Sequence, residues 1–165
     1  MKDFSTPKGQ IRLYNVMFPV WMFFMLPTPL WLFILPFNFA VDSLVELLAM
    51  KKYGYEDKTK VWKRSILPVW IIGFLCDFIG SILVFGVYML LDEVLTFNEL
   101  HTPPFEQLIV LPGVVLAGVL IYFLNRRFSF RKTGLTAEQI HKLSLALAIF
   151  TAPYTMLIPL RWIYW

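Results

Sequence analysis

The stretch ILPVWIIGFLCDFIGSILVFGVYMLL, residues 66–91, decides the fold. It contains no Lys or Arg and a single acidic residue, Asp77, near its middle. A transmembrane helix needs about 20 mostly apolar residues to cross a hydrocarbon core of about 30 Å. The stretch therefore predicts a membrane-spanning helix with one carboxyl group at about half depth.

The composition of the whole chain agrees with a membrane protein. Of its 165 residues, 58% are hydrophobic and 16% are charged, against about 45–50% and about 25% in soluble domains. A chain of this length cannot bury 16 Phe, 7 Tyr and 6 Trp in a soluble core, and its one cysteine allows no intrachain disulfide. We expect one integral membrane domain over residues 1–165, with the lipid bilayer as partner and no nucleic acid.

Three further apolar runs predict the remaining membrane segments, at residues 16–50, 107–124 and 143–160. The first run would be about 52 Å long as one helix, which is too long for one crossing. Thr28 is a good N-cap and Pro29 a good first helical residue, so we divide the run into segments 11–26 and 29–50. The predicted fold is an all-α polytopic transmembrane helical bundle of four to five membrane segments, the first a proline-broken helical hairpin.

The basic residues favour this hairpin. Three of them precede the first run, six lie in 51–64, five lie in 126–142, and Arg161 stands alone. The hairpin places the first three groups on one side of the membrane, the cytoplasmic side by the positive-inside rule. The alternative is one span at 16–35 followed by an amphipathic helix at the interface. The hairpin predicts a multi-pass protein of the inner (cytoplasmic) membrane with a cytoplasmic N-terminus.

Asp77 is the strongest candidate for a functional residue. An ionised Asp at mid-depth costs roughly 2.5–3.5 kcal/mol on insertion scales, so it must be protonated, paired or hydrated. One interpretation is a proton or cation site. The other is a protonated acid that only bonds to a neighbouring helix.

Asn38, Asp42 and Glu46 form a second candidate, because a spacing of four places them on one face of a helix. They predict either a polar track that leads into the bundle towards Asp77 or the polar face of an interfacial helix. If Asp42 and Asp77 lie close together, they would share a proton.

A basic string, NRRFSFRK at residues 125–132, follows the run at residues 107–124. Guanidinium groups bind phosphates bidentately, and the two Phe of the string would insert at the acyl boundary. We expect anionic lipid headgroups as partners of four residues: Arg126, Arg127, Arg131 and Lys132. An ordinary positive-inside anchor is the alternative. Over about ten residues the string resembles the one after the second helix of the GtrA-like small membrane proteins, and the resemblance implies a link to polyprenyl-phosphate sugars.

Small residues recur at helical spacing and predict close helix contacts, within the chain or between subunits. The pairs and ladders are Gly73 with Gly80, Gly113 with Ala117, and Ser144 with Ala148 and Ala152. We find no His-Glu-x-x-His, Gly-x-Ser-x-Gly, phosphate-loop or dinucleotide motif, so an enzyme is a weak interpretation and no metal or cofactor site is predicted.

The sequence therefore favours a role in transport or ion/proton coupling, within a homo-oligomer or a complex with other membrane subunits. The alternatives are a non-catalytic assembly or scaffold subunit, and a carrier or flippase for lipid-linked phosphate compounds.

Overall fold

The computed structural model describes residues 29, 31–92, 95 and 103–158, and the predicted segment 11–26 lies outside them. The described part is all-helical. Four helices, α2, α3, α5 and α6, are long and apolar enough to cross a membrane, the last together with the turn that follows it. Their bounds are Trp31–Lys52, Lys58–Asp92, Phe105–Leu124 and Ala137–Phe150. The predicted fold class, an all-α polytopic membrane protein, is confirmed.

Two helix boundaries differ from those predicted. Helix α3 begins at Lys58, eight residues before the apolar run, because charged residues can continue a helix beyond the hydrocarbon region. The last segment is not one continuous helix to residue 160. Helix α6 ends at Phe150, and a short 3₁₀ turn, Tyr154–Leu157, follows Pro153. Proline has no N–H group to extend a helix, which explains the break.

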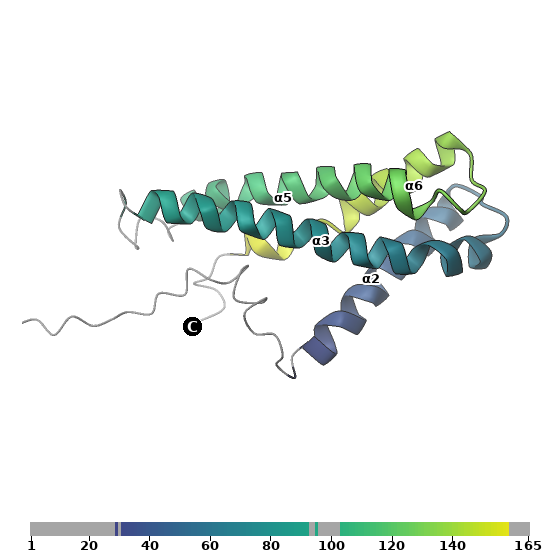
Figure 1. Ribbon diagram of the computed structural model, residues 1–165, viewed down its shortest axis with the longest axis horizontal. Coiled ribbons are helices and arrows are strands. Elements are labelled where there is room, and N and C mark those ends of the chain that lie inside the picture. The colour runs from purple at the N-terminus through teal and green to yellow at the C-terminus, as the bar shows by residue number, and fades with distance from the viewer. Residues whose placement is uncertain (1–28, 30, 93–94, 96–102, 159–165) are drawn as a thin grey trace, which may run out of the picture.

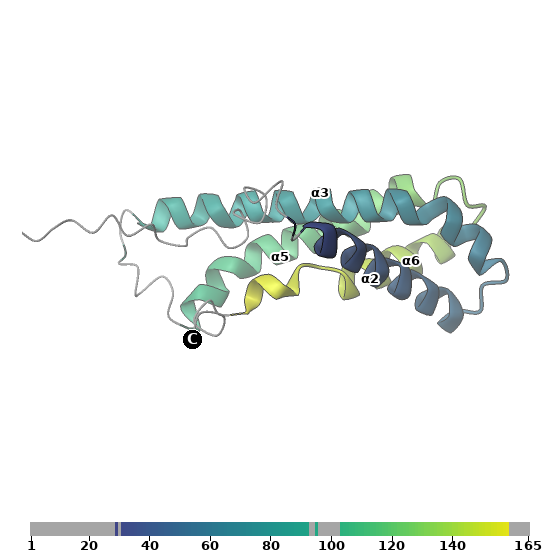
Figure 2. The same ribbon diagram turned by 90° about the horizontal axis from the view of Figure 1, so that it is seen from below.

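The helices form an elongated bundle (Figures 1 and 2). Helix α3 is the longest, and α5 runs antiparallel beside it. Helix α2 packs against both α3 and α6, and it leans away from α3 towards its own N-terminus (Figure 1). The side chains of Leu32, Phe33 and Phe37 in that leaning half are 73–75% exposed.

Glycine sets the distance between α3 and α5. A Cβ atom on Gly80 would lie 2.7 Å from the carbonyl oxygen of Gly113 and 3.1 Å from Cβ of Ala117. Gly118 faces α6 in a looser contact, with Ala148 and Ala152 next to it. The small residues predicted from the sequence thus pack within the chain.

The loops and helix ends at one end of the bundle are tied together by hydrogen bonds and packing. A capping box begins α6, since Thr136 Oγ1 accepts from Gln139 N–H and Gln139 Oε1 accepts from Thr136 N–H. Tyr55 donates its hydroxyl to Gln139 O at 2.8 Å. Burial raises the pKa of Tyr55 to about 12. Phe130 is fully buried in the hydrophobic core that also contains Tyr55.

All the Lys and Arg residues that the structure describes lie towards this same end (Figure 1). They belong to the end of α2, the start of α3, the segment after α5 and the start of α6. We call this the basic end. The members are Lys51, Lys52, Lys58, Lys60, Lys63, Arg64, Arg126, Arg127, Arg131, Lys132 and Lys142.

Candidate functional site

One face of α2 carries its acids into the bundle. The side chains of Asp42 and Glu46 are 2% and 0% exposed, and Asn38, one turn earlier, is half-buried. The opposite face carries exposed leucines such as Leu44 and Leu48. An amphipathic helix at the interface would turn its polar face to water. This helix does the reverse, so the alternative of an interfacial helix is wrong for these residues.

Glu46 meets Ser65 of α3 in a fully buried contact. Ser65 Oγ lies within hydrogen-bonding distance of both Glu46 Oε1 and the carbonyl oxygen of Val61, the latter at 2.8 Å. A serine hydroxyl has one hydrogen to donate. If that hydrogen goes to Val61, the Glu46 carboxyl must carry a proton and donate it to Ser65 Oγ. If the hydrogen goes to Glu46 instead, the carboxylate accepts it, so the contact fits either protonation state of Glu46.

Asp42 lies against a glycine. A Cβ atom placed on Gly73 of α3 would be 3.5 Å from Asp42 Oδ2, so the carboxyl faces bare backbone there. Among the described residues, this buried oxygen has no hydrogen-bond partner. Buried polar atoms in native proteins are normally bonded, and an unbonded oxygen invites a water, an ion or a proton.

Asp77 lies one helical turn beyond Gly73 on the same face of α3. Its Oδ1 is buried and finds no hydrogen-bond partner in the described part of the chain. The nearby hydroxyl of Ser81 donates to the backbone oxygen of Asp77, at 2.8 Å, and not to its carboxyl. Asp42 packs on Gly73, one turn from Asp77, so the two acids share the same stretch of the seam between α2 and α3.

The acids form a string along the seam between α2 and α3. Glu46 is nearest the basic end, Asp42 follows, and Asp77 is deepest. From Ser65 to Asp77 the string covers about 18 Å of α3 at 1.5 Å per residue. In the described ranges, no three His, Cys, Asp or Glu side chains converge as a metal site requires.

Apolar rings border this string. Phe39 of α2 meets Trp70 of α3 edge to face, with ring centroids 6.0 Å apart, and Trp70 meets Phe74 in the same way at 5.5 Å. Cys76 is fully buried in the main core, as expected for a small hydrophobic residue. Because these surroundings have a low dielectric constant, each charge on the string acts strongly on its neighbours.

The basic string after α5 is built differently from the prediction. Residues Asn125–Ser129 form a π-helical turn in which Asn125 donates to Ile121 O at 2.9 Å and Ser129 donates to Asn125 Oδ1 at 2.5 Å. Phe128 is 57% exposed, but Phe130 is fully buried. The expectation that both Phe reach the acyl boundary is therefore wrong for Phe130, because the π-turn rotates it into the core.

The four predicted lipid-binding residues, Arg126, Arg127, Arg131 and Lys132, are exposed at the basic end. The structure does not bring them to Asp77, because Arg64 Nη1 donates to Lys132 O at 3.5 Å and Arg64 lies about 20 Å along α3 from Asp77. Glu46 is the acid closest to the basic string, since its partner Ser65 is the residue after Arg64.

Sequence reasoning missed two partners. Ser65, which contacts Glu46, was not among the predicted site residues. Gly73, which contacts Asp42, was predicted only as a small residue for helix packing. The missing information was the register of α2 against α3, for which periodicity along one helix gives no signal.

No protein family, curated protein sequence or solved structure matches this chain.

Proposed function

We propose that this chain is a small multi-pass membrane protein that acts in transport or in ion/proton coupling. The observation that carries the proposal is the string of three acids along one helix seam within four apolar helices. Asp77 is its central protonatable group. Asn38, Asp42 and Glu46 are the access track from the basic end.

The energetics favour a functional role for these acids. An ionised carboxylate at mid-membrane costs roughly 2.5–3.5 kcal/mol on insertion scales. Three acids on one seam multiply this cost, and a leucine at each position would avoid it. Neighbouring carboxyls share protons and release them in separate steps. Starting with all three acids protonated, Asp77 can release its proton, Asp42 can pass its proton to Asp77, and Glu46 can pass its proton to Asp42 and take another from the basic end. Only one acid is then ionised at a time, so two adjacent charges are avoided.

The charge distribution supports an orientation. We place the basic end in the cytoplasm and the chain in the inner membrane, because loops rich in Lys and Arg resist translocation. Asp77 is then reached from the cytoplasm by way of Glu46. The N-terminal group of Lys2, Lys8 and Arg12 joins the same side if residues 11–26 form a crossing.

The proposal includes assembly with a second copy or with other membrane subunits. The small-residue faces of α3, α5 and α6 are already used inside the chain. The leaning half of α2, with Phe33 and Phe37 exposed, is the surface that a neighbour would cover.

The test is proton flux in liposomes that contain the purified chain and a trapped pH-sensitive dye. We expect Asp77→Asn to abolish flux and Asp42→Asn and Glu46→Gln to reduce it at least tenfold. Glu56→Gln is the matched control, because Glu56 is exposed in the loop between α2 and α3. Flux in Asp77→Asn equal to that of the unmodified chain would rule the proposal out.

The same variants separate the two alternatives. An assembly subunit would show no flux in any variant, and Asp77→Asn would lower the recovery of its complex. A carrier of lipid-linked phosphates would respond to charge reversal at Arg126 and Arg127 and much less to changes at Asp77.

A further inference from the structure

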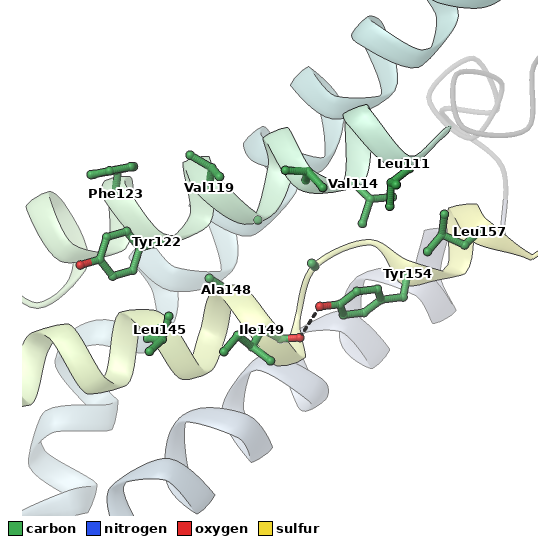
Figure 3. Close-up of a pocket in the computed structure, with 13 residues that line it drawn as sticks. Leu111, Val114, Val119, Tyr122, Phe123, Leu145, Ala148, Ile149, Tyr154 and Leu157 are labelled. Atoms are coloured by element: carbon green, nitrogen blue, oxygen red, sulfur yellow. Dashed lines mark hydrogen bonds between the residues drawn. The ribbon is translucent and has the colours of Figure 1, made fainter. Parts of the chain in front are cut away.

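An apolar groove runs between α5 and α6, away from the acids. Its volume is about 370 Å³, within the range of about 300–1,000 Å³ typical of ligand sites. Val119 lines the α5 side, and Leu145 and Ile149 line the α6 side (Figure 3). These three side chains are 42–49% exposed, so the groove is open along its length to whatever surrounds the bundle.

One end of the groove is polar. Tyr122 lines it, and its hydroxyl points towards the basic end (Figure 3). Arg126 Nη1 donates to this hydroxyl at 2.8 Å, and the hydroxyl is also 2.8 Å from His141 Nδ1. The guanidinium lies 5.9 Å from the centre of the Tyr122 ring. Tyr122 thus holds the Arg126 charge at the mouth of the groove.

The charge at this mouth is positive. Glu138, the acid in the first turn of α6, is neutralised by an ion pair with Lys142, whose Nζ lies 2.6 Å from Glu138 Oε1. A guanidinium has five N–H donors, so Arg126 can keep its bond to Tyr122 and still donate to two oxygens of a phosphate.

The length of the groove fits one lipid chain. Leu111 and Tyr122 both line it, and eleven residues of helix between them span about 17 Å. The hydrocarbon of one leaflet is about 15 Å deep, half of the whole core. A chain that starts at a phosphate on Arg126 therefore ends near Leu111.

We propose that this groove binds one acyl chain of an anionic phospholipid, with the phosphate group held by Arg126. Length, apolar lining and charge complementarity all point to this occupant. The site goes beyond proton coupling and does not depend on it, because Asp77 and the groove are formed by different helix pairs. Of the four residues predicted to bind lipid headgroups, Arg126 is then the one that determines the affinity for the phospholipid.

The test is native mass spectrometry of the full chain, delipidated in detergent and titrated with phosphatidylglycerol or phosphatidylcholine. Both lipids offer a phosphate to Arg126, but the choline cation of phosphatidylcholine is repelled by the positive mouth of the groove. We therefore expect phosphatidylglycerol to bind at least about tenfold more tightly. Arg126→Gln should remove this preference. Val119→Trp should fill the groove and weaken both lipids.

Two control variants match these changes. Arg127→Gln alters a neighbouring exposed arginine without a bond to Tyr122, and Ile82→Trp adds the same ring to an exposed position on α3. Both should change affinity less than about twofold. Asp77→Asn should bind lipid normally, which separates this site from the proposed proton path.

Four outcomes would overturn the proposal. The first is equal affinity for the two phospholipids, and the second is unchanged affinity in Val119→Trp. The third is a dimer that Val119→Trp dissociates, since the occupant would then be a second copy. The fourth is a polyprenyl monophosphate that displaces phosphatidylglycerol, which would favour the carrier function.

Discussion

Replacing Gly80 by Ala tests the packing that holds α3 in place. The new Cβ would lie 2.7 Å from Gly113 O, whereas ordinary contact begins near 3.4 Å, so α3 and α5 must separate by about 0.7 Å. The obstacle is backbone, which has no side-chain rotamer to adjust. A gap of this size forfeits a quarter to a half of each dispersion contact around it. We expect a loss of about 1–3 kcal/mol in unfolding free energy, as for other overpacked cores.

Gly86 provides the matched control on the same helix. Nothing lies within 4 Å of a Cβ atom placed there. Gly86→Ala should therefore leave stability unchanged or raise it by up to about 1 kcal/mol through helix propensity. The two variants make the same Gly→Ala change six residues apart on one helix, so the difference in their stabilities isolates the helix contact.

The assay is unfolding in mixed micelles by titration with sodium dodecyl sulfate, followed by far-ultraviolet circular dichroism. Gly113→Ala provides a second reading, because its Cβ would overlap Val84 Cγ2 as well as approach Gly80 O. Adding Val84→Ala removes the overlap with Val84 and should restore part of the lost stability. The recovery is incomplete because the close contact with Gly80 O remains. If Gly80→Ala is as stable as Gly86→Ala, the two helices do not touch as described and the reasoning fails.

Three further predictions concern single sites. Ser65→Ala should cost about 1–3 kcal/mol by removing the partner of buried Glu46, and Ser65→Ala with Glu46→Leu should recover most of it in the same micelle assay. Burial keeps the Tyr55 phenol protonated to about pH 12 in the folded chain, against 10.0 ordinarily, so its contribution to stability is complete below pH 10 and lost as the pH rises to 12. Tyr55→Phe should abolish that loss and remove one step, near pH 12, from the absorbance titration at 295 nm. Ser5→Cys should resist an impermeant maleimide added outside intact cells, with the buried Cys76 as a silent background, and labelling there would contradict the helical hairpin.

The local composition of the chain determined which parts enter the membrane. Apolar runs without Lys or Arg cannot satisfy their backbone in hydrocarbon except as helices. Residues 29–50 and 107–124 therefore predicted α2 and α5 closely, and residues 66–91 predicted the apolar part of α3. The start of α6 also depends on local chemistry, because both bonds of the capping box at Thr136 join residues three apart in the chain. Pro153 indicates the end of α6, but the apolar run continues to residue 160, so hydropathy alone predicted a longer segment.

Spacing along one helix could also place Asn38, Asp42 and Glu46 on one face. It could not say what that face meets, because the same pattern fits a bundle seam and a membrane surface. The partners Ser65 and Gly73 come from the register of α2 against α3, which depends on packing between distant segments. The π-turn that buries Phe130 and the bond from Arg126 to Tyr122 depend on the same kind of contact. The sequence by itself determined the membrane as solvent and the acids as candidates, since both follow from local chemistry. Only the tertiary structure decided which helices enclose the acids and where the groove lies, since both depend on how four helices pack together.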